Sequence, residues 1–250
     1  MENKKGISGS TLKMIANVTM VIDHIGAAVL ARLLMVNGLG ELDQTNADAI
    51  MLWLSANGAL YWTYTVMRMI GRVAFPIFCF LLVEGFLHTH DVKKYAMRIG
   101  LFALISEIPF DLMYGGTWFY PVHQNVIWTF ILGLLGIHIM ETVRKKKKTP
   151  VFVLTAILVT IAGGLLGTLT MVDYYGIGVL TVFIFYFFRG RKWWCLLGQI
   201  VALYWVNVEL LGGLMYPVRL FGMEFELCQQ GLALQIYCHE RKKSSPNSMV

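Results

Sequence analysis

Charged side chains are scarce in this 250-residue chain, in which Asp, Glu, Lys and Arg together make up 14% of the residues. Soluble proteins carry about 25% charged residues, so the composition argues against a water-soluble globular domain. No polar stretch is long enough to form a second domain. The hydrophobic content of 57% and the mean hydropathy of +0.61 instead predict an integral membrane protein in a lipid bilayer.

Cysteine patterns typical of metal or redox sites are also missing. The 4 cysteines are scattered, with no CxxC pair and no Cys and His residues at the spacing of a zinc site. Cys79 and Cys195 lie in or beside apolar runs, which predicts that they are small buried residues. The sequence therefore predicts neither a metal site nor disulfide bonds.

Apolar runs that can cross a bilayer recur along the chain and predict an all-α fold, a polytopic membrane helix bundle of about 8 transmembrane helices. The predicted spans are 12–35, 69–88, 95–114, 124–143, 151–172, 174–188, 193–211 and 223–237. Residues 49–67 are rich in Trp and Tyr, which concentrate at the headgroup level, so we expect an interfacial or re-entrant helix there. The whole of 12–237 is predicted to form a single transmembrane domain.

Basic residues occur in short clusters between the apolar runs, as the positive-inside rule produces. With the N-terminus inside, this rule places all basic residues on the cytosolic side except Arg32, Arg68, Arg72 and Arg219. The pattern predicts a multi-pass protein of the bacterial cytoplasmic membrane, with a cytosolic N-terminal tail (1–11) and a basic cytosolic tail (238–250). The net charge of +6 is explained in this way without a nucleic acid partner. The first apolar run is too long for a cleaved signal peptide, so we expect it to be retained as an anchor.

Asp23 and His24 stand side by side within the first apolar run, about 16 Å beyond Lys13 at the helical rise and so near the bilayer midplane. A charge at that depth costs about 2.5–3.5 kcal/mol. Neighbouring helical residues diverge by about 100°, so one side chain should face a cavity and the other should pair with a neighbouring helix. Two interpretations stay open for each: function, or a His24 bonded to a backbone carbonyl and a structural ion pair of Asp23.

Further intramembrane charges suggest an internal polar cluster. Glu107 and Asp111 share a helix face, and Pro109 between them opens the helix locally. Arg72 and Glu84 lie on the preceding span, and Arg72 is a natural partner for Asp23, Glu107 or Asp111. A purely structural network is the alternative interpretation.

Polar side chains also open the 124–143 span, where His123, Gln124 and Asn125 form either a polar rim or a helix cap. At the other end of that span, the basic run 144–148 serves topology and attracts anionic lipids, or attracts the phosphates of a nucleotide cofactor.

Several blocks resemble TraX-type membrane proteins. They are MVIDHIG at 20–26, IGRVAFPIF at 70–78, LVEGF at 82–86, FALISEIPFD at 102–111, QNV at 124–126 and DYYGIGVL at 173–180. The resemblance implies a multi-span acetyltransferase that moves acetyl from cytosolic acetyl-CoA to an amine or hydroxyl acceptor. The founding member acetylates the N-terminus of conjugative pilin; the acceptor here is unknown.

Carried over to this chain, the resemblance implies that His24 transfers the acetyl group with Asp23 and Arg72 in support. The other polar residues of the cluster are expected to assist, and they are Glu84, Glu107, Asp111, His123 and Asn125. We expect the phosphates of acetyl-CoA to dock near Lys13, Lys93 and Lys94.

The end of the chain departs from the family, whose members usually close with a Tyr-Asn-Gly motif and a Tyr-Pro-x-His block. Residues 230–234 begin as expected, and the sequence then changes to a polar tail. Two alternatives therefore remain beside the acetyltransferase. One is a proton-coupled transporter, because chains of intramembrane Asp, Glu, His and Arg also form proton relays. The other is a non-catalytic membrane protein with an altered C-terminus.

Overall fold

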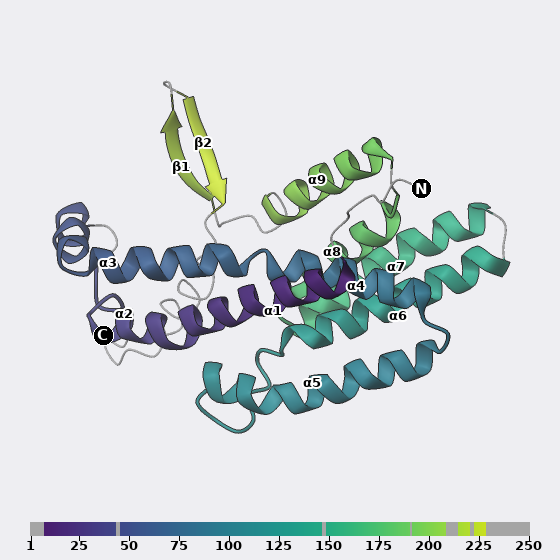
Figure 1. The fold of residues 1–250 in the computed structure, drawn as a ribbon. Coiled ribbons are helices and arrows are strands. Elements are labelled where there is room, and N and C mark those ends of the chain that lie inside the picture. Colours follow the sequence, from purple (N-terminus) through teal and green to yellow (C-terminus); the bar gives the residue numbers. More distant parts are fainter. Residues whose placement is uncertain are drawn as a thin grey trace, which may run out of the picture. The chain divides into compact units, whose positions relative to one another are not determined.

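The computed structural model describes residues 8–43, 46–146, 149–190 and 192–208, together with the backbone of the strands β1 Met215–Leu220 and β2 Met223–Cys228 (Figure 1). The chain divides into two compact units. The first contains the residues up to Ile77 and the two strands, and the second runs from Phe78 to the end of the last helix. Each unit is described by itself.

The first unit is built on a pair of long helical stretches. α1 Gly9–Ile25 continues through a π-helix, η1 Gly26–Leu30, into α2 Ala31–Val36. α3 Ala47–Gly71 packs along α1 and η1 (Figure 1). Asn46 fixes the start of α3, because its side chain accepts hydrogen bonds from two backbone N–H groups of the first turn.

The segment 49–67 lies inside α3, which is continuous over 25 residues. The helix stops at Gly71, and the chain turns at residues 72–73 before α4 Ala74–His88 begins. Pro76 explains the interruption, because it has no N–H to donate to the carbonyl of Arg72, four residues earlier. A position of 49–67 in the membrane interface stays a prediction.

The second unit is helical. After α4, whose first residues belong to the first unit, its elements are α5 Val92–Tyr114, α6 Val126–Lys146, α7 Thr149–Leu169, α8 Tyr175–Phe187 and α9 Trp193–Val208. α8 forms the core, since it packs against α6, α7 and α9, and nine of its thirteen residues are buried. A helix that is apolar all round is typical of such a buried position.

α7 and α8 approach each other closely at two glycines. The Cα of Gly176 lies so near Gly167 that a Cβ at Gly167 would be 2.9 Å from it, and a Cβ on Gly176 would collide with the Gly164 carbonyl. The backbone N–H of Gly176 also donates to the Thr168 hydroxyl at 3.3 Å. Small residues at this crossing allow backbone contact between apolar helices, as is common in membrane bundles.

Replacing Gly176 with alanine should lower the free energy of unfolding by about 1–3 kcal/mol, because the added methyl overlaps a backbone carbonyl that has no room to move. Gly100→Ala in α5 is the matched control, since nothing lies within 4 Å of its Cβ. That change should stabilise the helix by about 0.5–1 kcal/mol. Chemical unfolding in detergent measures both variants, and equal stabilities would contradict the close crossing.

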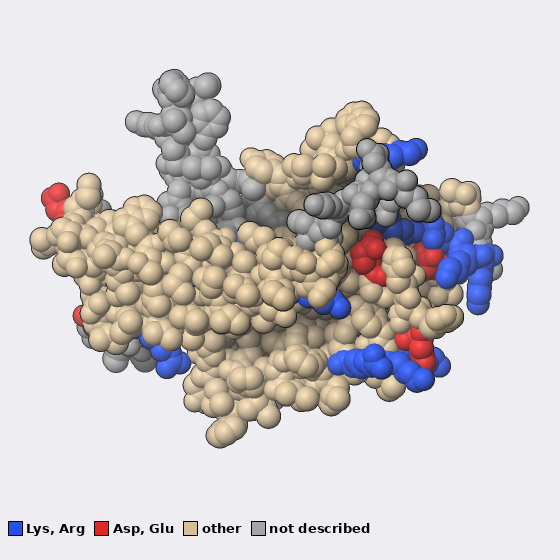
Figure 2. Space-filling view, in the orientation of Figure 1, with Lys and Arg blue, Asp and Glu red and all other residues tan. Residues whose placement is uncertain are grey.

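The outer surface of the helices is largely apolar. Along α7, the side chains of Leu154, Leu158, Ile161 and Leu165 are about half exposed and recur at helical spacing. On the face drawn in Figure 2, most of the surface carries neither acidic nor basic side chains. Such a surface suits a lipid environment, so the protein is a membrane protein.

Four helical stretches of the described residues are long and apolar enough to cross a bilayer: Gly9–Val36, Ala47–His88, Val126–Lys146 and Thr149–Leu169. Tyr175–Phe187 and Trp193–Val206 are shorter apolar helices. The predicted helical membrane fold is confirmed at this level, while eight spans and cytosolic termini stay predictions. Cys79 and Cys195 are buried, as predicted.

The predicted eighth span, 223–237, is wrong in its first part. Met223–Cys228 is a strand, paired antiparallel with Met215–Leu220 in the register Met215 to Cys228. A charged residue alternates with apolar ones here, as Glu224, Phe225, Glu226 and Leu227, and this period of two favours a strand over a membrane helix. Residues 229–237, and the C-terminal motif that departs from the family, lie outside the described residues.

Candidate functional sites

Asp23 forms an ion pair with Arg68 inside the first unit. Oδ2 of Asp23 lies 2.5 Å from Nη1 of Arg68, and the two side chains are 20% and 12% exposed. Charges in an apolar setting need such a partner, because an unpaired one carries a large desolvation cost. Helix geometry predicted that one of Asp23 and His24 pairs with a neighbouring helix, and Asp23 does so, with Arg68 of α3. The predicted pairing with Arg72 stays a prediction.

Several local features surround the Asp23–Arg68 pair. Gly71 has no side chain, and a Cβ at this position would collide with the Asp23 carboxylate. Tyr64, Arg68 and Arg72 follow one another at intervals of four residues and therefore lie along one face of α3. Tyr64 is buried and lies within electrostatic range of Asp23 and both arginines. The π-helix begins three residues after Asp23, and π-helices occur frequently at functional sites.

His24 points away from this pair and is exposed. Its Nδ1 lies 2.8 Å from the backbone carbonyl oxygen of Met20. A carbonyl can only accept, so Nδ1 must carry the proton, and the neutral ring then has its lone pair on Nε2. His24 is therefore bonded to a backbone carbonyl, as one of the two interpretations of the sequence predicted. The same bond nevertheless leaves His24 with a basic, nucleophilic nitrogen directed outward.

In the second unit, Glu107 is the acceptor of a compact polar group. The indole N–H of Trp128 donates to its Oε2 at 2.8 Å, and the side-chain amide of Asn125 donates to the same oxygen. Asn125 also donates to the Ala103 carbonyl at 2.9 Å and accepts from the backbone N–H of Ile127. Asn125 is thus both a helix cap of α6 and a tie to α5.

Asp111 and His123 continue this group. Asp111 is buried, and its Oδ2 accepts from the backbone N–H of Tyr120 at 3.0 Å. Nε2 of His123 lies 3.6 Å from Oδ1 of Asp173, which precedes α8. Phe110, Tyr114 and Tyr175 surround the imidazole with ring centroids 5.4 to 6.2 Å away. The structure therefore brings Glu107, Asp111, His123 and Asn125 to one end of the second unit, which we call the acidic end.

Strained backbone closes the acidic end. Met171, Tyr174 and Tyr175 have φ of 52°, 63° and 48°, in the left-handed region that side chains other than glycine rarely occupy. A parallel bridge between Gln124 and Val172 holds this segment beside the start of α6. Such strain persists only where surrounding contacts impose it, and it concentrates at functional sites.

Replacing Glu107 with leucine should cost about 1–3 kcal/mol of unfolding free energy, because the buried donors of Trp128 and Asn125 lose their acceptor. Glu107→Gln keeps an oxygen in that place, so it should cost less than half as much. Thermal unfolding in detergent compares the two variants. If both cost the same, the charge of Glu107 and not its hydrogen bonds maintains the acidic end.

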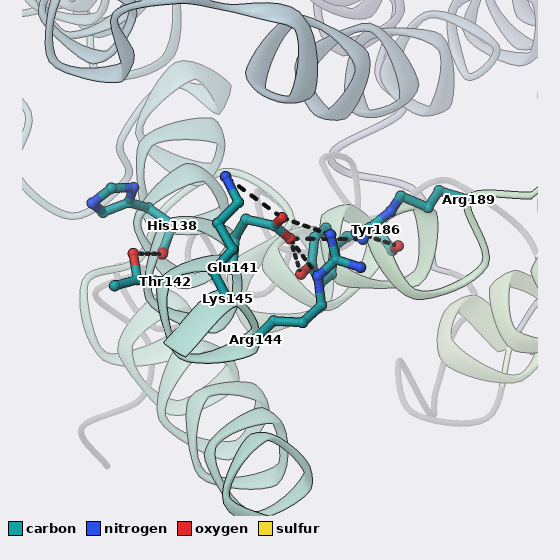
Figure 3. A network of polar contacts seen from close by, with 7 residues as sticks. All are labelled: His138, Glu141, Thr142, Arg144, Lys145, Tyr186 and Arg189. Atoms are coloured by element: carbon teal, nitrogen blue, oxygen red, sulfur yellow. Dashed lines mark hydrogen bonds and ion pairs between the residues drawn. The ribbon is translucent and has the colours of Figure 1, made fainter. Parts of the chain in front are cut away.

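A second polar group lies at the opposite end of α6, about 24 Å from Asn125 at the helical rise. Glu141 is buried there and accepts from Arg144 at 2.6 and 3.0 Å and from the Tyr186 hydroxyl at 2.8 Å (Figure 3). Arg189 and Lys145 lie 3.6 and 4.0 Å from the same carboxylate. We call these five residues the Glu141 network.

The other predicted site residues lie elsewhere. Glu84 does not lie at the acidic end, since its neighbour Gly85 packs against Tyr95 near the start of α5. The Glu84 carboxylate pairs with His88 at 3.6 Å. The exposed cations predicted to bind the cofactor fall in different units, with Lys13 in the first and Lys93 and Lys94 in the second. Lys94 pairs with Asp91 at 3.6 Å.

Arg68, Trp128, Glu141 and Tyr186 were not predicted as site residues, whereas the basic run that contains Arg144 and Lys145 was expected to attract phosphates. The spacing of Arg68 four residues before Arg72 is a signal that was available. No group of three or more His, Cys, Asp or Glu side chains in the described parts of the chain is arranged to hold a metal ion.

Comparison with known proteins adds the family. The model of the TraX protein family matches residues 8–236. A probable fimbrial assembly protein, FimC of serogroup H1 from Dichelobacter nodosus, is 29% identical over 146 residues, which are 56% of this chain and 49% of that protein. The chain thus spans about half the length of this relative. No solved structure gives a significant match. Because the family match covers every described helix and both strands, the chain belongs to the TraX family.

Proposed function

We propose that this TraX-family membrane protein is an acetyltransferase in which His24 receives or directs the acetyl group. The observation that supports this role most is the geometry of His24. Its Nδ1–H is held by the Met20 carbonyl, so Nε2 of this exposed residue keeps its lone pair, while the preceding residue, Asp23, fixes α1 to α3. An imidazole nitrogen that keeps its lone pair can act as a nucleophile or as a general base.

The chemistry proceeds in two steps at Nε2. Acetyl-CoA supplies the acyl group as a thioester. His24 attacks the carbonyl carbon through Nε2, so that an N–C bond forms, the C–S bond breaks and the thiolate leaves and takes a proton. An amine or hydroxyl acceptor then attacks the acetyl-imidazole, transfers its proton to solvent and releases His24 unchanged. Alternatively, Nε2 removes the acceptor proton while the acceptor attacks the thioester directly.

Asp23, Arg68 and Arg72 position this histidine. The Asp23–Arg68 pair fixes α1 against α3 on the side of the helix that His24 does not occupy. Arg72 follows Arg68 by one turn and adds a further positive charge to the same face of α3, next to the carboxylate side of α1.

The acceptor in this proposal is a protein subunit of a surface fibre. A related chain is named a probable fimbrial assembly protein. Acetyl transfer across the membrane requires that the donor bind on one side and the acceptor on the other. We place the N-terminus and the Glu141 network on the cytosolic side of the cytoplasmic membrane, within a bundle of membrane-spanning helices. Reporter fusions at residues 2, 120 and 190 should show the first and last inside and the middle one outside.

Radiolabelled acetyl-CoA tests the activity with purified protein in liposomes. Label should transfer to the protein in the absence of acceptor, and to the amino group of an added peptide acceptor in its presence. Incorporation no greater than in empty liposomes, with or without acceptor, would sink the proposal. The liposomes need protein in both orientations, so that the donor reaches the catalytic side.

A proton-coupled transporter is the second candidate, and the acidic end favours it. Glu107 and Asp111 each have one buried carboxylate oxygen, Oε1 and Oδ1, without a hydrogen-bond partner among the described residues. Such oxygens can hold a proton, and intramembrane carboxylates and histidines form proton relays. Proton flux in proteoliposomes that requires a solute and ignores acetyl-CoA would favour transport over acetyl transfer.

A further inference from the structure

Positive charge exceeds negative charge in the Glu141 network. Three cations, Arg144, Lys145 and Arg189, share the carboxylate of Glu141, so two positive charges are left over. Basic side chains gather in Figure 2 at the end of the second unit where α6 and α7 join. Glu141 itself is only 8% exposed, whereas Lys145 and Arg144 are 72% and 47% exposed. The cations therefore reach the surface while their anchor stays inside.

The two arginines are held in place before any ligand arrives. Nε and Nη2 of Arg144 donate to the Glu141 carboxylate. Nη1 of the same guanidinium can therefore donate to a ligand. The guanidinium of Arg189 lies over the Tyr186 ring at 4.2 Å and donates to the Tyr186 carbonyl at 3.3 Å (Figure 3). Because these side chains are already ordered, a ligand that binds them costs less conformational entropy.

We propose that the Glu141 network is a binding site for a phosphate group, contacted by Arg144, Lys145 and Arg189. Guanidinium groups present paired donors that match phosphate oxygens, and such charge-assisted hydrogen bonds are stronger than neutral ones. The phosphate belongs either to an anionic lipid headgroup or to a nucleotide such as coenzyme A. The site does not depend on acetyl transfer, and it differs from the lysines predicted to dock the cofactor, Lys13, Lys93 and Lys94.

Binding of two probes to the purified full-length chain tests the site. The probes are coenzyme A, measured by calorimetry in detergent, and phosphatidylglycerol, measured as lipid retained from mixed phosphatidylcholine nanodiscs. Arg189→Gln should lower the affinity for the probe that occupies the site about tenfold, and Lys145→Gln should lower it about threefold, as expected for the loss of one charge-assisted contact. Lys145 is largely exposed and lies 4.0 Å from Glu141, so its substitution leaves the fold intact even if Arg189→Gln does not.

The exposed Arg98 of α5 provides the control, because Arg98→Gln removes a positive charge of the same unit that is not part of the Glu141 network. Weaker coenzyme A binding in both network variants and not in Arg98→Gln supports a nucleotide phosphate. Lower phosphatidylglycerol retention alone supports a lipid headgroup. Binding of both probes unchanged in folded Lys145→Gln, or reduced equally by Arg98→Gln, overturns the site. None of these outcomes depends on labelling of His24, so failure of the acetyltransferase proposal is recognised separately.

Discussion

His24→Asn should reduce acetyl transfer by about 10²–10⁴-fold, the range that general acid–base catalysis contributes. The asparagine amide can still donate to the Met20 carbonyl as Nδ1 does, so the helix keeps its local hydrogen bond. It has no basic nitrogen in place of Nε2. The variant therefore removes the proposed chemistry with little change in structure. Initial rates with radiolabelled acetyl-CoA in liposomes measure the effect.

His88→Asn is the matched control for this experiment. Nδ1 of His88 lies 2.9 Å from the backbone carbonyl of Glu84, in the same local geometry as His24. His88 lies at the end of α4 and is mostly exposed, and its pair with Glu84 is exposed as well, unlike the shielded Asp23–Arg68 pair. Its substitution should leave the rate unchanged. Equal rates in wild type and His24→Asn, with the fold intact, would remove His24 from the mechanism.

Asp23→Leu should lower the free energy of unfolding by about 3–5 kcal/mol, because it breaks a buried ion pair and leaves the Arg68 charge without its carboxylate. The pair is largely shielded from solvent, so screening by water and salt does little to reduce this cost. The double variant Asp23→Leu with Arg68→Leu should recover most of the loss, since two apolar side chains replace the pair. Unfolding by denaturant in detergent measures all three proteins.

Lys94→Ala is the comparison variant for a solvent-exposed ion pair, because both side chains of the Lys94–Asp91 pair are exposed. Its loss should cost less than about 1 kcal/mol. If Asp23→Leu proved as mild as Lys94→Ala, the Asp23–Arg68 contact would contribute no more than a surface pair. A double variant no more stable than Asp23→Leu would show that Asp23 acts through other contacts than the ion pair.

Apolar run length predicted the helices well, because the cost of exposed backbone polar groups in lipid leaves little choice but a helix. Helix geometry also predicted that Asp23 and His24 diverge, and that Asp23 pairs with another helix. The partner itself was missed. Run length says where a helix lies but not which face it turns to a neighbour, so the choice of Arg68 depended on packing that only the structure shows.

The contacts of Tyr186 and Arg189 with Glu141 could not be predicted from the sequence, for a related reason. Tyr186 and Arg189 lie 45 or more residues from Glu141 in sequence, and their meeting requires that α8 pack beside α6. Hydropathy alone does not distinguish the strand at 223–228 from the start of a membrane helix, whereas the period-two alternation of Glu224 to Leu227 does. The polar group at the acidic end was partly predicted, since Glu107 and Asp111 share a face by spacing alone.

The π-helix after His24 has a consequence for how this segment can change. The N–H of Ala31 donates to the carbonyl of Gly26, five residues back, so this turn holds one residue more than an α-helical turn. Removing any one residue of 26–30 would restore a regular α-helix and leave the faces of α1 and α2 close to their present directions, because the π-helix accommodates its extra residue within its own turn. A single-residue deletion is therefore tolerated here, whereas the same deletion within a regular α-helix would rotate every later side chain by about 100°.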